Sequence, residues 1–229
     1  MTTVLLVRHG LTDANASGVL AGWTPGVHLA DRGREQAKAL GERLAAVPVS
    51  AIVSSPLERC QETAAYLLAG REGLTVITDD RLGECRYGDW EGQPLKTLAK
   101  DPLWKVVQAH PSAATFPGGE SLRDTQARAV DAVRTRNAEL GEHATWIAVS
   151  HGDVIKAILA DALGMHLDAF QRIQVDPASL SVVSYTAMRP FVGRLNDKGA
   201  PVGDLVPPKK RSRRKPGSDA AVGGGAGSG

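Results

Sequence analysis

Cysteines and long apolar runs are both scarce in this sequence. Its 229 residues include two cysteines, Cys60 and Cys85, which are too few for a disulfide scaffold, so two reduced thiols are expected. No segment approaches the roughly 18 consecutive apolar residues of a membrane-spanning helix, and the N-terminus lacks the regions of a signal peptide. These absences predict a soluble, cytoplasmic protein with no membrane contact.

An excess of charge of either sign is also missing, because the formal net charge is only +2. Six lysines and arginines between 209 and 215 stand against Asp219 in the last 25 residues, so 205–229 carries +5 and 1–204 carries −3. We expect one domain over 1–204 and a basic, Gly-rich disordered tail over 205–229. Nucleic-acid binding through 209–215 is the alternative for the tail, but the acidic body and the lack of a basic, aromatic face argue against it.

Two short apolar runs end in the same His-Gly pair. Residues 4–7 lead into Arg8-His9, and residues 146–150 lead into His151. Such runs are typical of strands that are buried on both faces of a parallel sheet. Because open α/β sheets bind ligands at the carboxyl ends of their strands, Arg8 and the two histidines are predicted to share one site.

Helical and strand patterns alternate along the rest of the chain. A loop is predicted over 11–29, an amphipathic helix over 31–46, and further helices over 121–140 and 153–163. Further strands are predicted over 51–53, 74–77, 182–185 and 191–195. This alternation predicts a three-layer α/β/α sandwich with a largely parallel central sheet. Residues 93–120, with a short helix over 95–108, are expected to cover the site and to decide the substrate.

The segment after the strand at 51–53 places an arginine near the same sheet edge. Ser55 is a suitable N-cap, Pro56 suits the first helical position, and Glu58 would complete a capping box. This prediction puts Arg59 in the first helical turn, where a guanidinium and a helix N-terminus together favour an anion. A solvated helix arginine is the alternative for Arg59 taken alone.

Five motifs stand in a fixed order along the chain. They are Leu6-Val7-Arg8-His9-Gly10 with Thr12 and Asn15, Ser54-Ser55-Pro56-Leu57 with Arg59, Glu84 with Gly88 and Trp90-Glu91-Gly92, Phe116-Pro117-Gly118-Gly119-Glu120-Ser121, and Val149-Ser150-His151-Gly152. The ordered set resembles the histidine phosphatase superfamily, also called phosphoglycerate mutase-like. The resemblance covers residues 4 to about 190 and implies the α/β/α fold of that family.

The resemblance also implies a role for each site residue. His9 looks like the nucleophile that forms a phosphohistidine, and an imidazole must be neutral to attack phosphorus. Arg8, Arg59 and His151 would hold the phosphoryl oxygens. Glu84 looks like the general acid and then the base that activates water. Substrate binding is expected from Thr12, Asn15, Gly22 and Gly152, and neither a metal nor another cofactor is implied.

Alternatives to this interpretation remain open. Two histidines and a carboxylate could bind zinc, although two arginines in one pocket would repel a dication. The chain could also be a catalytically inactive, phosphate-binding relative. Leu11, Ala21 and Cys60 depart from the family pattern, so the polarity of the pocket is not predicted. A redox switch at Cys60 and Cys85 is less favoured than a role as small buried hydrophobes.

Phosphatase and mutase activities must also be distinguished. Glu84 is followed by Cys85-Arg86-Tyr87-Gly88 and then by Asp-Trp-Glu-Gly, the pattern of the phosphatase branch. We therefore predict metal-independent hydrolysis of a small phosphorylated metabolite through a phosphohistidine. A cofactor-dependent phosphomutase of the phosphoglycerate mutase type is the alternative. The physiological substrate and the oligomeric state, for which a homodimer is one option, stay open.

Overall fold

The central sheet is built around the N-terminal apolar run. In the computed structural model, which describes residues 1–206, strand β1 (Thr2–Arg8) belongs to a six-stranded sheet of order β3-β2-β4-β1-β5-β6. The other strands are β2 (Ala51–Ser54), β3 (Val76–Thr78), β4 (Thr145–Ser150), β5 (Leu180–Tyr185) and β6 (Pro190–Asp197). β1 pairs in parallel with β4, β4 with β2 and β2 with β3, whereas β5 and β6 pair antiparallel. The predicted sandwich with a largely parallel sheet is confirmed.

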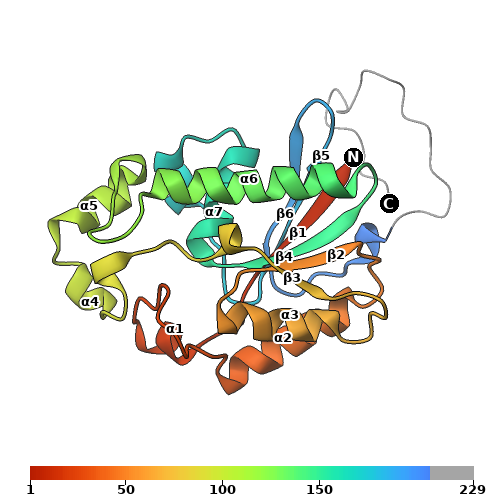
Figure 1. Ribbon diagram of the computed structural model, residues 1–229, viewed down its shortest axis with the longest axis horizontal. Helices are drawn as coiled ribbons and strands as arrows, with labels where there is room; N and C mark the ends of the chain where they lie inside the picture. The colour runs from red at the N-terminus through yellow and green to blue at the C-terminus, as the bar shows by residue number, and fades with distance from the viewer. Residues whose placement is uncertain (207–229) are drawn as a thin grey trace.

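Helices cover both faces of this sheet (Figure 1). The pair α2 (Asp31–Leu44) and α3 (Glu58–Leu68) lies on one face, and the pair α6 (Leu122–Leu140) and α7 (Gly152–Ala162) on the other. Three short helices, α1 (Asp13–Ser17), α4 (Leu95–Leu98) and α5 (Pro102–Ala109), lie beyond the carboxyl ends of the parallel strands. The 3-10 turns are η1 (Asp80–Leu82), η2 (Gly88–Trp90), η3 (Pro111–Ala113), η4 (Leu167–Arg172) and η5 (Gly203–Leu205).

Two apolar clusters hold the three layers together, because successive side chains of a strand point to opposite faces. Val4 and Leu6 of β1 pack in the cluster that contains residues of α6 and α7. Leu5 and Val7 pack in the cluster that contains residues of α2 and α3. All four are fully buried, and each such burial stabilises the fold by about 1.5–3 kcal/mol. The end of β1, where the predicted site begins, is therefore fixed from both sides.

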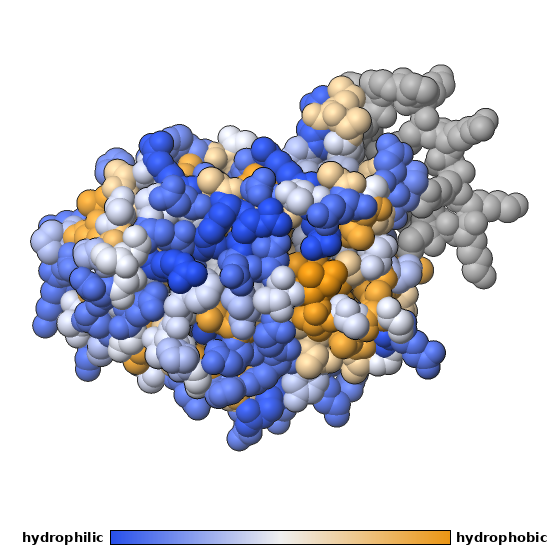
Figure 2. All heavy atoms as spheres, in the orientation of Figure 1, coloured by the Kyte–Doolittle hydropathy of each residue, from blue (hydrophilic) through white to orange (hydrophobic). Residues whose placement is uncertain are grey.

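The outer surface varies from one region to another. Figure 2 shows a mostly hydrophilic surface over α6 and a hydrophobic patch in the region where Figure 1 draws β2 and β3. Within this region Ile77, on the edge strand β3, is 37% exposed. Among residues 1–206, no helix combines the length and the apolar character needed to cross a bilayer.

The predicted start of α3 is wrong. Leu57 is the N-cap and the helix begins at Glu58, so Ser55 and Pro56 precede it and no capping box forms. A tertiary contact competes with the predicted cap, because Ser55 Oγ lies 2.8 Å from Nε2 of His151, whereas the hydrogen bond that it accepts from Leu57 N is longer, at 3.3 Å. Arg59 nevertheless stands in the first helical turn, as predicted.

Three other boundaries differ from the predictions. The strand predicted at 74–77 is formed by Val76–Thr78, and the loop predicted over 11–29 contains α1. The helix predicted at 95–108 is divided into α4 and α5, because Asp101 caps a new helix that starts with Pro102. The helix predicted from 121 does begin there, and Ser121 and Asp124 form a capping box at its start.

The folded body continues beyond the predicted boundary at 204. Gly203–Leu205 form η5, and Leu205 packs against the cluster that contains α2 and α3 residues, in which Val202 is buried. The rest of the predicted tail, 207–229, lies outside the described residues.

Candidate active site

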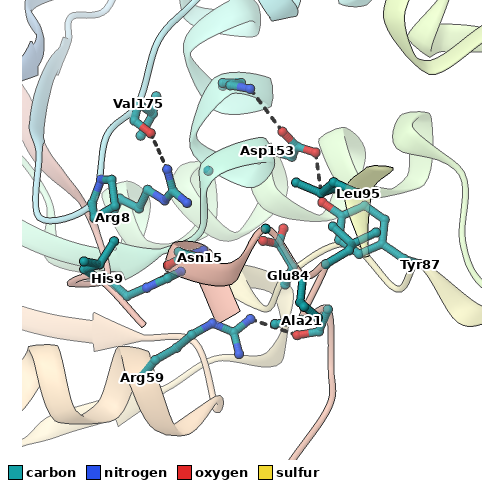
Figure 3. Close-up of a pocket in the computed structure, with 18 residues that line it drawn as sticks. Arg8, His9, Asn15, Ala21, Arg59, Glu84, Tyr87, Leu95, Asp153 and Val175 are labelled. Atoms are coloured by element: carbon teal, nitrogen blue, oxygen red, sulfur yellow. Dashed lines mark hydrogen bonds and ion pairs between the residues drawn. The ribbon is translucent and has the colours of Figure 1, made fainter. Parts of the chain in front are cut away.

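A cleft of about 440 Å³ opens at the carboxyl ends of the parallel strands. The chain leaves β1 at His9 and β4 at His151, and these strands are neighbours, while β2 flanks β4 and leads into the helix that carries Arg59. Seven of the nine predicted site residues line the cleft: Arg8, His9, Asn15, Gly22, Arg59, Glu84 and Gly152 (Figure 3). The other two, Thr12 and His151, are fully buried beside it.

His9 is 2% exposed, and its ring is held in one tautomer. Its Nδ1 lies 2.7 Å from the carbonyl oxygen of Gly10. Because a carbonyl can only accept, Nδ1 donates this hydrogen bond and Nε2 keeps its lone pair. Burial, together with the positive charges of Arg59 and Arg8, holds the pKa of His9 well below its usual value. The imidazole is therefore neutral and suited to nucleophilic attack.

The two arginines present hydrogen-bond donors that have no acceptor. Arg8 Nη1 donates to Val175 O at 2.7 Å, and Arg59 Nη2 donates to Gly22 O at 2.8 Å. Arg8 Nε and Arg59 Nη1, by contrast, are buried without a hydrogen-bond partner among the described residues. An unsatisfied buried donor costs about 1–3 kcal/mol or more. These atoms therefore mark a site for an oxyanion, which would supply the missing acceptors.

The N-terminus of α7 lies beside the oxyanion site marked by Arg8 and Arg59. Gly152 is the first residue of this helix, and a side chain there would lie 3.5 Å from the Arg8 guanidinium. Free backbone N–H groups and the helix dipole favour negative charge at such a terminus. Two guanidiniums and a helix N-terminus thus converge beside His9.

His151 lies behind His9, with 5.3 Å between the ring centroids. Arg59 Nη2 donates to its Nδ1 at 3.2 Å, and its Nε2 lies 2.8 Å from Ser55 Oγ. Burial and the charge of Arg59 hold the pKa of His151 well below its usual value. Both ring nitrogens have protein partners here, so the predicted contact of His151 with a phosphoryl group stays a prediction.

Thr12 and Asn15 cap the short helix α1. Thr12 Oγ1 accepts from Asn15 N at 3.2 Å, and Asn15 Oδ1 accepts from Thr12 N at 3.2 Å and from Thr12 Oγ1 at 3.0 Å. Because Oδ1 is engaged in the cap, the Nδ2 amide group is the part of Asn15 that can donate into the cleft. The predicted role of Thr12 in substrate binding stays a prediction.

Glu84 lies in the loop between η1 and η2, and its side chain is 13% exposed. Oε1 accepts from Cys85 N at 2.9 Å, and Oε2 lies 3.8 Å from His151 Nδ1. Burial, reinforced by the carboxylate of Asp153, raises the pKa of Glu84 to about 7, although Arg59 opposes this shift. A carboxyl group with this pKa can both donate and accept a proton near neutral pH.

Two residues outside the cleft hold the Glu84 loop through its backbone. Arg128 of α6 donates to the carbonyls of Gly83 and Glu84 at 2.8 and 3.0 Å, and it binds both carboxylate oxygens of Glu120 at 2.6 and 3.0 Å. Trp23 Nε1 donates to Glu84 O at 2.6 Å. The position of Glu84 therefore depends on two separate parts of the chain.

Three polar residues of the cleft were not predicted: Tyr87, Asp153 and Lys156. The Tyr87 hydroxyl donates to Asp153 Oδ2 at 2.8 Å. Lys156 Nζ lies 3.3 Å from Asp153 Oδ1 and 3.1 Å from Gln171 Oε1. A sequence signal existed, because Asp153 and Lys156 occupy one face of the first turns of the helix that follows His151.

The two cysteines are buried in opposite apolar clusters. Cys60 Sγ lies 3.4 Å from His151 Nε2, but burial raises the pKa of its thiol to about 12. Burial also raises the pKa of Cys85. Since the thiolate is the reactive form, neither environment favours redox chemistry.

Within the described part of the chain, no group of three or more His, Cys, Asp or Glu side chains is arranged to hold a metal ion. Metal-independent activity stays a prediction.

The fold and the site together define a class of α/β protein in which an oxyanion site surrounds a neutral histidine at the sheet edge. Within this class the chain belongs to the histidine phosphatase superfamily (branch 1), whose family model matches residues 4–198. It is 33% identical to the "Probable phosphoglycerate mutase GpmB" of Yersinia pestis (strain Pestoides F) over 187 residues, and this aligned region covers 81% of this chain and 86% of that protein. The family predicted from the sequence is confirmed.

Solved structures with the same fold include phosphatases. Bacillus stearothermophilus YhfR matches with a TM-score of 0.80 and 30% identity, over 90% of this chain and 100% of that one. The alpha-ribazole phosphatase from Shigella flexneri matches with a TM-score of 0.77 and 28% identity, over 87% and 98%. The mycobacterial glucosyl-3-phosphoglycerate phosphatase in complex with VO3 matches with a TM-score of 0.77 and 30% identity, over 85% and 98%.

Proposed function

We propose that the protein hydrolyses a phosphomonoester of a small metabolite through a phosphohistidine at His9. The observation that carries this proposal is the cleft shared by the neutral His9 and the unpartnered donors Arg8 Nε and Arg59 Nη1. A nucleophile and the donors for a phosphoryl group are the two parts that phosphoryl transfer requires in one place.

In the first step, Nε2 of His9 attacks phosphorus and the P–O bond to the leaving alcohol breaks. Arg8, Arg59 and the N-terminus of α7 stabilise the charge on the remaining phosphoryl oxygens. Glu84 is protonated at this stage and transfers its proton to the leaving oxygen. The Gly10 carbonyl accepts from Nδ1–H and so stabilises the positive charge of the phosphorylated ring.

In the second step, the Glu84 carboxylate takes a proton from water, and the water oxygen attacks phosphorus. The P–N bond breaks, inorganic phosphate leaves, and His9 and Glu84 return to their starting protonation states. A phosphomutase, the second candidate, would instead return the phosphoryl group to a substrate hydroxyl and exclude water. The likeness to the "Probable phosphoglycerate mutase GpmB" favours that candidate.

A phosphate-release screen over phosphorylated metabolites, run beside a 3- to 2-phosphoglycerate isomerisation assay, tests the proposal. We expect phosphate release without isomerisation, unchanged by a metal chelator. His9→Ala abolishes turnover, whereas His110→Ala, at a side chain that is 74% exposed, retains it. Protein quenched during turnover carries an acid-labile phosphoryl group in the wild type and not in His9→Ala. A near-wild-type rate for His9→Ala, or isomerisation faster than phosphate release, overturns the proposal.

A further inference from the structure

Beyond the oxyanion site, the cleft presents mainly apolar side chains. Its lining includes Leu11, Val19, Leu20, Leu95, Val175 and Pro177. Since the two arginines place the phosphoryl group, the leaving group of a substrate must lie against these apolar residues.

Backbone hydrogen bonds build one apolar wall of the cleft from two segments. Leu20 N donates to Gln93 O at 3.0 Å, and Gly92 N donates to Leu20 O at 2.7 Å. Leu95 N donates to Gly18 O at 2.8 Å in the same way. The backbone positions of Leu20 and Leu95 beside the cleft are therefore fixed by the fold.

Among the described residues, the charges that line the cleft leave no cation for a second anionic group. Arg8 and Arg59 serve the oxyanion site, and Lys156 is the remaining cation among the described lining residues. Lys156 already pairs with Asp153 at 3.3 Å, and its side chain is only 18% exposed. The Asp153 carboxylate faces the same space, so a substrate carboxylate would meet like charge there.

We propose that the leaving group of the substrate is uncharged and has an apolar face, so that the phosphoryl group is the substrate's one anionic group. This inference rests on the proposed function and narrows it. Phosphoglycerates, which carry a carboxylate, are then poor substrates.

A matched pair of aryl esters tests the charge. 4-Carbamoylphenyl phosphate and 4-carboxyphenyl phosphate have nearly the same shape and differ by one negative charge. We expect the wild-type kcat/KM to favour the carbamoyl ester by about tenfold or more. Equal values, or a preference for the carboxyl ester, overturn the inference and leave the phosphatase activity standing. Hydrolysis of neither ester counts against the proposed function itself.

The Asp153–Lys156 pair gives the matching variant. Asp153→Asn keeps the size of the side chain and an acceptor for Tyr87 but removes one negative charge and the ion pair of Lys156. We expect the preference for the carbamoyl ester to fall severalfold. Asp31→Asn, at a side chain that is 93% exposed, should leave the preference unchanged. An unchanged preference in Asp153→Asn contradicts the role given to this pair.

A series of n-alkyl phosphates tests the apolar face. Burial of one methylene is worth about 0.8 kcal/mol, which corresponds to about a fourfold change in an equilibrium constant. We therefore expect kcat/KM to rise by about two- to fourfold per methylene, less steeply in Leu20→Asn. A series that does not rise with chain length contradicts the apolar half of the inference.

Discussion

At the scale of single residues, one environment moves two pKa values apart. Burial raises the pKa of Glu84 to about 7 because it penalises the carboxylate, and Asp153 adds to the shift. The same burial penalises an imidazolium, and Arg59 and Arg8 add to that shift, so the pKa of His9 falls. Between these two pKa values, Glu84 is protonated while His9 is neutral, which is the state that the proposed phosphorylation step needs.

The pH dependence of the reaction follows from these directions. For an alkyl phosphate, kcat/KM should fall as the pH rises through about 7, because Glu84 loses the proton that the leaving oxygen requires. The acid limb should lie well below the usual pKa of histidine, because His9 becomes protonated only there. Glu84→Gln should remove the fall in kcat/KM above pH 7. Comparing the wild type and Glu84→Gln on the same ester cancels the effect of substrate ionisation, because it is the same for both.

Glu84→Gln should also lower the rate on the alkyl phosphate by about a hundredfold or more. The loss on p-nitrophenyl phosphate should be much smaller, since nitrophenolate leaves without a proton. An equal loss on both esters would argue against Glu84 as the acid.

The sequence predicts some of these residues and cannot predict others. Arg8, His9 and His151 are predictable because each follows an apolar run and therefore stands at a strand end. Asp153 and Lys156 were missed because two charges three positions apart on a helix are usually a solvated face. Only the packing of α7 against the sheet turns that face toward the cleft.

At the scale of elements, the Glu84 loop has no regular structure of its own beyond the short turns that flank it. Its position depends on α6, through the hydrogen bonds from Arg128 to the carbonyls of Gly83 and Glu84. The Arg128 guanidinium is itself held in position by its ion pair with Glu120. Arg128 therefore acts as a positioning residue for the proposed acid.

Arg128→Ala should destabilise the fold and misplace Glu84. Loss of hydrogen bonds to a charged group costs about 2 kcal/mol, measurable as a lower free energy of unfolding in urea. On an alkyl phosphate kcat should fall more than KM changes, because Arg8 and Arg59 stay in place. Arg134→Ala, on the same helix but with a side chain that is 64% exposed, should leave the free energy of unfolding and kcat unchanged. If Arg128→Ala slows p-nitrophenyl phosphate as much as the alkyl ester, the residue is merely structural.

The start of α3 marks the limit of local prediction at this scale. The pattern of Ser55, Pro56 and Glu58 satisfies every local requirement of a helix N-terminus, yet the helix begins later. A contact with His151, 96 positions away in the chain, engages the Ser55 hydroxyl. Ser121 and Asp124 have no such competing contact among the described residues, and they form a capping box where the helix was predicted to begin.

At the scale of the whole molecule, the site depends on strand order. β1 and β4 are far apart in the sequence, but their parallel register pairs Arg8 with Ser150, so His9 and His151 emerge together. The repeated His-Gly pair in the sequence suggests this arrangement. The sequence does not, however, show that β4 lies next to β1 in the sheet, because strand order depends on tertiary packing. The end of the folded body is another such property, because Val202 and Leu205 belong to the core only through their contacts with the cluster beneath α2 and α3.

Two truncations locate that end. A chain that stops at residue 206 should keep the wild-type free energy of unfolding and kcat, because every cleft residue named above lies within 1–206. A chain that stops at residue 201 loses Val202, which is 9% exposed, and the packing of Leu205. It also loses the ion pair between Asp204 and Arg194.

Full burial of a side chain of this size is worth about 1.5–3 kcal/mol, and Leu205 is only partly buried, so the shorter chain should lose about 2–4 kcal/mol of its free energy of unfolding. Urea unfolding followed by tryptophan fluorescence compares the three chains. If the chain ending at 201 unfolds at the wild-type urea concentration, η5 adds nothing to the folded body. If the chain ending at 206 is less stable or less active than the wild type, residues 207–229 contribute to stability or activity. Replacement of the six lysines and arginines between 209 and 215 with glutamine then tests whether their charge is the cause.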